Sequence, residues 1–343
     1  MSIEEVLASV WFNAAVAAIL AGVVTVIITI AIERFGSFGP VLATTPTTVI
    51  FSCIGFAVET NKKTELTLGE KQSKLTSTLF VVPLGMAFSA GLLLIYRFLP
   101  SKLPSSWGKL KLPVVTAVAL FVWLLMATSS VLLIRYVFTN YQKFPHDEGI
   151  IALGSVFSVL VFVLGVAFCW YPPPPSGKRK PVKWYILVLR GVLAATCIGT
   201  AVLLKKVDDL VAGIAGVFPA IYLTTMISLW ISQGEEVLSR SVGPLILGST
   251  SVILFAIVSD FTLLNINIPA GIAIAYVSSV IFCSIPIFYF VQWRIKRCYP
   301  DLVKAKPEQT QTTTSEDVIV EVDQDEIEER NVTSPLLSSP TIN

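Results

Sequence analysis

Four threonines surround a proline in a stretch that is otherwise mostly apolar. The stretch reads ERFGSFGPVLATTPTTVIFSCIG and runs from Glu33 to Gly55. Proline lacks a backbone N–H and clashes with the carbonyl four residues earlier, so a helix here should bend or break near Ala43. The threonine hydroxyls then either satisfy the carbonyl groups that the break frees or line a path for a polar solute or ion. The residues concerned are Thr44, Thr45, Pro46, Thr47 and Thr48.

A second group of small hydroxyl side chains lies in the C-terminal half of the chain. Two threonines follow Pro219 in one apolar run, and the motif GSTS lies in the next run. Such hydroxyls also serve simply as packing contacts between helices. Our working hypothesis is that they face the first group and complete a substrate pathway. They are Thr224, Thr225, Ser249, Thr250 and Ser251.

Ionisable residues inside long apolar runs are costly in a membrane and therefore indicate function. Asp260 lies near the end of such a run, and its short side chain cannot reach a distant headgroup, so we predict that it couples transport to a cation or a proton. Glu59 and Glu236 are further coupling candidates, because they occupy equivalent positions in a repeat described below. Arg135 and Arg190 lie near the ends of their runs, where long side chains extend to the membrane surface.

The sequence does not indicate a metal site, a disulfide or an enzyme. The five cysteines form no CxxC or Cys/His spacing, and the one histidine, His146, lies between apolar runs. The chain contains no phosphate-binding glycine loop with its lysine, no GxSxG elbow and no HExxH motif, and GSTS has no histidine partner. We therefore predict no cofactor and no enzymatic activity.

Long apolar helices are the elements that would position these residues. The chain is 54% hydrophobic and 14% charged, and its mean hydropathy is +0.75, as expected of a protein with several membrane spans. A span needs about 20 apolar residues, and about nine such runs occur. The first run follows Glu4 and Glu5 rather than a basic leader, so we expect a retained helix. The runs cover roughly 8–32, 39–58, 76–98, 113–138, 149–171, 184–204, 209–232, 242–263 and 269–292.

The two halves of the chain resemble each other. GSFGPVLATTPTTVIFSCIGFAVE aligns without a gap with GIAGVFPAIYLTTMISLWISQGEE, at one constant offset. The offset pairs Gly36 with Gly213, Gly39 with Gly216, Thr47 with Thr224, Thr48 with Thr225 and Glu59 with Glu236; after a longer loop, Pro83 pairs with Pro244 and Leu84 with Leu245. Chance alignment of apolar segments is the alternative explanation. An odd number of spans separates the copies, so the second copy would insert upside down, as in many secondary transporters.

We therefore predict an all-α polytopic membrane protein of about nine helices, built from two inverted four-helix repeats and a connecting helix. The first repeat covers 1–138, and the connecting helix with its basic loop covers 139–183. The second repeat covers 184–302. Residues 303–343 form an acidic tail that is too polar to bury a core, and we expect it to be disordered and cytosolic.

The second repeat carries a basic residue early in its first helix, then a polar break, then an Ala-Gly pair and a Phe-Pro pair in its next helix. These features are Arg190, Lys205 to Asp209, Ala212-Gly213 and Phe218-Pro219. Over residues 186–236 this layout resembles the small four-helix bacterial GlpM-like membrane proteins. The resemblance implies a fused tandem of a unit that elsewhere stands alone, and it supplies no substrate. The first repeat departs from the layout, since it has Gly39-Pro40 and the threonine cluster instead.

Basic residues favour the cytosolic side of a membrane. The basic segments 101–113, 172–184 and 292–306 all fall on one side, which places the C-terminus in the cytosol. The loop 59–76, with four lysines, is an exception. In the tail, YPDL from Tyr299 to Leu302 and the pair Leu336-Leu337 resemble sorting signals, so we expect sorting adaptors as partners. These signals favour an endosomal or lysosomal membrane, with the plasma membrane as the alternative.

The sequence thus favours a multi-pass transporter that moves a small solute or ion between the broken helices of the two repeats. The alternative is a non-transporting scaffold or lipid-handling protein whose tail recruits partners. The lipid bilayer is the expected surrounding in both cases, and nucleic acid is not an expected partner.

Overall fold

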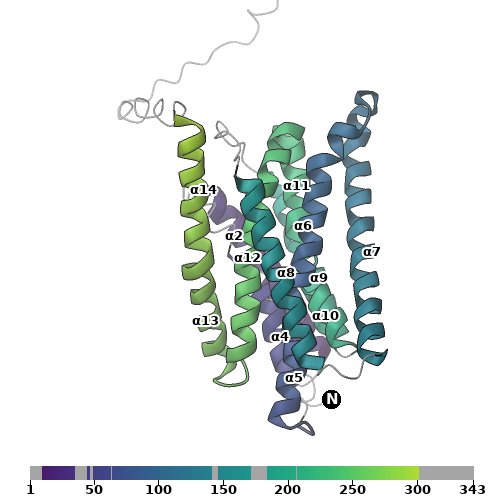
Figure 1. Cartoon of the computed structure of the whole chain (residues 1–343), viewed down its shortest axis with the longest axis vertical. Coiled ribbons are helices and arrows are strands. Elements are labelled where there is room, and N and C mark those ends of the chain that lie inside the picture. Colours follow the sequence, from purple (N-terminus) through teal and green to yellow (C-terminus); the bar gives the residue numbers. More distant parts are fainter. Residues whose placement is uncertain are drawn as a thin grey trace, which may run out of the picture. The chain divides into compact units, whose positions relative to one another are not determined.

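The computed structural model describes residues 10–34, 45–46, 49–62, 64–140, 146–170, 184–205 and 207–300. These residues form helices and turns, and no strand occurs among them. Figure 1 shows the arrangement of the helices. They are α2 (Val10–Arg34), α4 (Val49–Asn61), α5 (Leu68–Leu79), α6 (Val82–Phe98), η2 (Pro100–Lys102), η3 (Ser105–Leu110), α7 (Lys111–Asn140), α8 (His146–Cys169), α9 (Trp184–Leu204), α10 (Asp209–Ala215), α11 (Ala220–Gln233), α12 (Glu235–Thr262), α13 (Ile268–Ser279), η4 (Val280–Ser284) and α14 (Ile285–Cys298).

Among the described residues, six helical segments are long and apolar enough to cross a membrane. Two further apolar helical segments, Trp11–Ile27 and Val49–Asn61, are shorter. This arrangement fits a multi-pass membrane protein. The six segments are Leu68–Lys102, Lys111–Val137, Asp147–Cys169, Trp184–Leu204, Ser241–Thr262 and Ile268–Cys298.

Several of these helices are interrupted or contain a proline. α5 and α6 are separated at Phe80 and Val81, just before Pro83. α10 ends at Ala215 and α11 begins at Ala220, so the predicted helix 209–232 breaks at Pro219. In the predicted helix 39–58, Pro46 is not helical and α4 begins at Val49, while Ala43 lies outside the described residues. α12 contains Pro244, and a π-helical segment, η4, joins α13 to α14.

α2 and α9 cross through small residues. A Cβ on Gly22 would lie 2.9 Å from the carbonyl oxygen of Gly191, and a Cβ on Gly199 would lie 3.1 Å from the Cβ of Ala18 and 3.5 Å from the carbonyl oxygen of Ala14. The numbers rise along one helix as they fall along the other, so the two helices are antiparallel. Glycine is required at these positions because the backbones approach so closely.

α8 packs against both α6 and α12 through glycines. A Cβ on Gly154 would lie 2.4 Å from the carbonyl oxygen of Phe80, which precedes α6. A Cβ on Gly243, near the start of α12, would lie 2.6 Å from the carbonyl oxygen of Phe168. The first half of α8 therefore contacts the start of α6, and its second half contacts the start of α12. The Leu68–Lys102 segment lies at the centre, with 78% of its most apolar window buried.

One end of the bundle gathers arginines and aromatic rings. The buried Arg294 of α14 donates hydrogen bonds to the carbonyl oxygen of Trp170, and its guanidinium lies 4.3 Å from the centre of that indole ring. Arg97 of α6 lies 4.7 Å from the ring centre of Phe168. The C-terminal ends of α6, α8 and α14 thus meet, and Figure 1 shows α14 and the α6–α7 connection ending on the same side. The basic segment 101–113 and residues 292–300 therefore flank one end, whereas 172–183 and 301–306 lie outside the described residues.

Candidate functional site

A cluster of polar side chains surrounds α5 at the opposite end of the bundle. α5 is the least apolar helix of the described part, and its start is fixed by a capping box in which Thr67 and Glu70 satisfy each other's backbone N–H groups. From Leu75 to Leu79 the helix is fully buried, and that stretch includes Thr76 and Thr78. Polar groups on different sides of α5 meet partners from different helices.

Asp260 of α12 faces α5 and is only 2% exposed. The hydroxyl of Thr76 donates to its carboxylate and lies 3.0 Å from both Oδ1 and Oδ2. Gln72, one turn earlier on α5, donates from Nε2 to the backbone carbonyl oxygen of Asp260 at 2.8 Å. Because that carbonyl can only accept, the amide oxygen of Gln72 is turned away from it.

The same face of α5 meets a second carboxylate. Ser73 Oγ donates to Oδ1 of Asp147 at 2.8 Å, and Asp147 lies in the first turn of α8. Ser73 and Thr76 are three residues apart and therefore neighbours on the helix surface. Asp147 also interacts electrostatically with Asp260. α5 thus holds carboxylates from α8 and α12 near each other.

Asp260 has no cationic partner within the described part of the chain. The ion pairs found there join Lys111 to Glu235, Arg135 to Asp208 and Lys205 to Asp209. Gln72, which contacts the backbone of Asp260, and Ser259, which precedes Asp260 on α12, each have a buried side-chain oxygen without a hydrogen-bond partner among the described residues. A buried polar group without a partner is costly.

On another side α5 contacts a buried lysine. Lys205, directly after α9, is 2% exposed and donates to the hydroxyl of Thr78 and, at 3.1 Å, to the carbonyl oxygen of Lys74. Its ammonium also forms an ion pair with Oδ1 of Asp209 at 2.8 Å and lies 5.9 Å from the ring centre of Phe56. This lysine ties α9 and α10 to α5.

α4 contributes a further buried carboxylate. Glu59 is 7% exposed, and its Oε2 has no hydrogen-bond partner among the described residues. The hydroxyl of the next residue, Thr60, is buried in the same way. Glu59 therefore remains a candidate for binding a proton or cation. The side chain of Glu236, predicted to be its equivalent, lies outside the described residues.

The break between α10 and α11 lies next to this cluster. A Cβ on Gly213 would lie 2.3 Å from the carbonyl oxygen of Thr78, so α10 packs directly on the backbone of α5. Within the break, the carbonyl oxygen of Gly216 accepts a hydrogen bond from Ser52 of α4 at 3.4 Å. Phe218 packs edge-on against Trp123 of α7, with ring centres 5.0 Å apart. The break is therefore buried by protein, as irregular backbone in a membrane must be.

The predicted pathway residues are only partly described. Thr44, Thr47 and Thr48 lie outside the described residues, whereas Thr45 and Pro46 are buried. Thr224, Thr250 and Ser251 each donate to a carbonyl oxygen of their own helix, as packing hydroxyls do. Thr225 is half-buried. Ser249 makes a contact between helices, 2.9 Å from the hydroxyl of Tyr222.

Of the predicted sorting residues, Tyr299 is described, and it follows the end of α14. Leu302, Leu336 and Leu337 lie outside the described residues.

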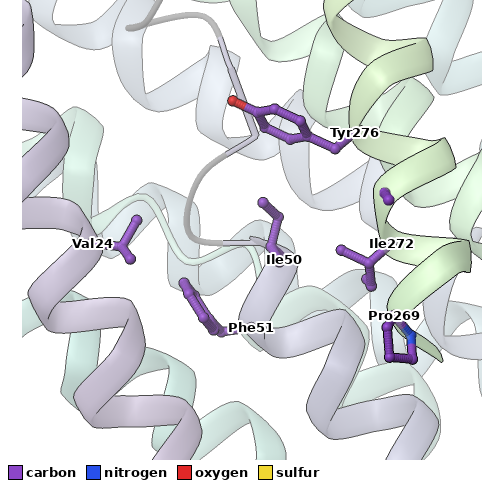
Figure 2. Close-up of a pocket in the computed structure, with 7 residues that line it drawn as sticks. Val24, Ile50, Phe51, Pro269, Ile272 and Tyr276 are labelled. Atoms are coloured by element: carbon purple, nitrogen blue, oxygen red, sulfur yellow. The ribbon is translucent and has the colours of Figure 1, made fainter.

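An apolar cavity of about 350 Å³ lies apart from the polar cluster, between α2, α4 and α13. Figure 2 shows Val24 of α2 and Phe51 of α4 on one side and Ile272 of α13 on the other, with the hydroxyl of Tyr276 as the polar group of the lining. The neighbouring side chains of α2 and α13 are exposed and apolar, so in a membrane the cavity adjoins lipid. They are Val23, Ile27, Ile274 and Val277.

Sequence reasoning identified Asp260 and missed what surrounds it. In the sequence, Thr76 lies at the edge of the apolar run 76–98, and Lys205 and Asp209 lie in a polar break between two runs. Neither feature indicates a contact between α5 and another part of the chain. The available signal was the segment QSKLTST directly before the apolar LFVVPLG, since a polar helix that continues into a buried one must bring its polar groups inside.

Comparisons of the chain with protein-family models, with curated proteins and with solved structures found no match.

Proposed function

We propose that this chain is a multi-pass membrane transporter that moves a small solute or ion between the broken helices of two repeats. The observation that carries the proposal is Asp260, a carboxylate that is 2% exposed in a membrane-length helix and has no cationic partner among the described residues. Such residues are rare within membrane spans, and they mark ion or substrate paths.

The two-repeat architecture, with about nine spans, is part of this proposal. It is supported by the crossing of α2 and α9. Under the offset that pairs Gly36 with Gly213, Ala14 corresponds to Gly191 and Gly22 to Gly199. The contact of Gly22 with Gly191 then maps onto the contact of Ala14 with Gly199. Two antiparallel helices that exchange contacts in this way are related by a local twofold axis, which is what an inverted repeat requires.

The connecting helix fits the same axis. α8 contacts the start of α6 with its first half and the start of α12 with its second half, through Gly154 and Phe168 respectively. α6 and α12 are the helices that contain Pro83 and Pro244, which the sequence alignment pairs. The polar cluster around α5, by contrast, belongs to one end of the bundle, so the two halves would not share every role. The GlpM-like ancestry of the unit remains part of the proposal.

The transport path that we propose runs along the break at Gly216 to Pro219 and past α5 to Asp260. The freed carbonyl at Gly216 and the hydroxyl of Ser249 supply polar groups along it. Asp260 and Glu59 are the proposed coupling residues. We also propose a cytosolic C-terminus and an endosomal or lysosomal membrane, because of the basic segments and the sorting motifs.

Access of water to the path tests this function. In a variant without the five native cysteines, single cysteines at positions 45, 225 and 250 should react with a charged, membrane-impermeant thiol reagent. Cysteine at Glu65, in an exposed loop, is the positive control, and cysteine at Leu133, an exposed apolar residue of α7, is the lipid-facing negative control. Reaction at Glu65 alone would contradict a path and favour the scaffold.

Flux is the direct measurement. Full-length protein in liposomes that contain a pH-sensitive dye is supplied with a panel of sugars, amino acids and inorganic ions under a potassium–valinomycin clamp. We expect at least one solute to move in wild type and Asp260→Asn to abolish its coupled proton or cation movement. Glu148→Gln, an exposed acid at the same end, is the matched control. Flux that Asp260→Asn leaves unchanged would contradict the role of this residue.

Lipid handling is the second candidate function, and the apolar cavity favours it. An opening between three helices that adjoins lipid can accept an acyl chain. Two results together would support lipid handling over transport. A photoreactive fatty acid should label the residues that line the cavity, and cysteines at 45, 225 and 250 should not react with the thiol reagent.

A further inference from the structure

We propose that a monovalent alkali-metal cation binds between α5 and α12, with Asp260, Thr76 and Gln72 as its protein ligands. The inference deepens the proposed transport and rests on it for its role in coupling. Cation binding is measured without any transport, so a failure to bind the cation would not contradict transport, and an absence of transport would not contradict cation binding.

The geometry supplies an oxygen-rich site. The carboxylate of Asp260 has four lone-pair positions, and the single proton of the Thr76 hydroxyl, 3.0 Å from both oxygens, satisfies at most one of them. The amide nitrogen of Gln72 is fixed on the backbone carbonyl of Asp260, so the amide group of Gln72 lies beside the residue that supplies the carboxylate. The amide oxygen of Gln72 is buried and has no hydrogen-bond partner among the described residues. Hard cations bind oxygen ligands of this kind.

A metal cation accounts for more of these groups than a proton does. A proton on Asp260 would neutralise the carboxylate but would leave the oxygen of Gln72 without a partner among the described residues. A metal cation bound by the carboxylate can also take the Gln72 oxygen as a ligand.

Charge balance favours a monovalent ion. Among the proposed ligands Asp260 contributes one negative charge, and Thr76 and Gln72 are neutral, so a divalent ion would carry one positive charge that its own ligands do not neutralise. Asp147 adds negative potential from the start of α8. Asp147 is half-exposed, and it therefore lies on the side from which an ion from solvent would approach.

A bound cation would also link two elements. α5 ends before the junction at Phe80 and Val81, and the cation would add a contact from α5 to α12. The cation would hold α5 against α12 when present and release it when absent. This is the kind of ion-dependent helix contact that secondary transporters use for coupling.

The test is binding of radioactive sodium to the purified full-length protein in detergent, together with its unfolding temperature in sodium chloride against N-methyl-glucamine chloride at constant ionic strength. We expect saturable sodium binding and an unfolding temperature that rises with sodium. Asp260→Asn should abolish both effects. Thr76→Val and Gln72→Leu should weaken sodium affinity by about tenfold or more. Glu148→Gln, the exposed control, should leave both unchanged.

Two results would overturn the proposal. Stabilisation by acid pH without any sodium dependence would assign a proton to Asp260 instead of a metal ion. Sodium binding that Asp260→Asn, Thr76→Val and Gln72→Leu all leave unchanged would place the ion elsewhere. If Asp260→Asn fails to fold, the half-exposed Gln72 supplies the decisive variant, because its replacement alters only the outer part of the site.

Discussion

Replacement of Gly213 by alanine should destabilise the protein, although alanine normally stabilises a helix. Gly213 lies within α10, and a Cβ there would be 2.3 Å from the carbonyl oxygen of Thr78, 3.2 Å from its carbonyl carbon and 3.4 Å from its Cα. All three atoms are backbone atoms, so no rotamer change relieves the clash. α10 must instead move away from α5 by about 1 Å, which is overpacking of a rigid contact.

The expected cost follows from two opposing effects. Overpacking of this kind costs about 1–3 kcal/mol, and a backbone contact belongs in the upper part of that range. Alanine in place of glycine gains about 1 kcal/mol in a helix interior. The net loss of unfolding free energy should therefore be about 1–2 kcal/mol.

Two other glycines provide matched controls. A Cβ on Gly69, in the first turn of α5, meets nothing within 4 Å, so Gly69→Ala should be neutral or stabilising by up to about 1 kcal/mol. A Cβ on Gly91 in α6 would meet the sulfur of Met126 at 3.7 Å, an ordinary contact with a flexible side chain. Gly91→Ala should therefore be neutral or stabilising by up to about 1 kcal/mol.

The assay is unfolding of full-length protein by SDS titration in mixed micelles, followed by tryptophan fluorescence. The three alanine variants should differ in sign as well as in size. If Gly213→Ala were as stable as Gly69→Ala, α10 would not pack on the backbone of α5. The position of Lys205 and Asp209 beside Thr78 would then be wrong as well.

Three further outcomes are expected. Thr47→Val combined with Thr48→Val should abolish flux in liposomes while membrane insertion, measured by protease protection, stays intact; unchanged flux would leave only a structural role for the break. Trp123→Phe removes an indole N–H that is buried without a partner among the described residues, which stabilises by about 1–3 kcal/mol, and it leaves a void beside Phe218, which destabilises by a similar amount, so the free energy of unfolding should change by less than about 2 kcal/mol. A loss above about 3 kcal/mol would mean that the N–H is bonded. Ala273→Trp should fill the cavity of about 350 Å³ and reduce labelling by a photoreactive fatty acid to background, whereas persistent labelling would place lipid at another surface.

The helices were the predictable part of this fold, because their signals are local. The run 184–204 coincides with α9, since polar residues precede Trp184 and Lys205 follows its end. The break at Pro219 follows from the proline itself. The edge of the run 76–98 was wrong because α5 begins at Leu68, where the composition is polar and only burial by neighbouring helices makes the segment part of the bundle.

Of the candidate site, only Asp260 was predictable from the sequence. Asp260 stands out because a charge within an apolar run needs an explanation. Its partner Thr76 is far away in sequence and lies in a segment that resembles an ordinary loop. Lys205 was likewise assigned to a polar break, since nothing local indicates that its ammonium turns inward to Thr78. Pairing over such distances is a property of helix packing, which one sequence does not encode in any short pattern.

The crossing of α2 and α9 has a consequence for how the protein is made. The glycine and alanine face of α2 finds its partner only when α9 leaves the ribosome, roughly 170 residues later, which at ordinary synthesis rates is a delay of about 10 to 35 s. During that interval Gly22 and Ala14 face lipid or a chaperone instead of Gly191 and Gly199. A chain that stops after α8 would keep this face uncovered permanently. Truncated products should therefore be recognised by membrane quality control, and the first half should accumulate only when the second half is supplied.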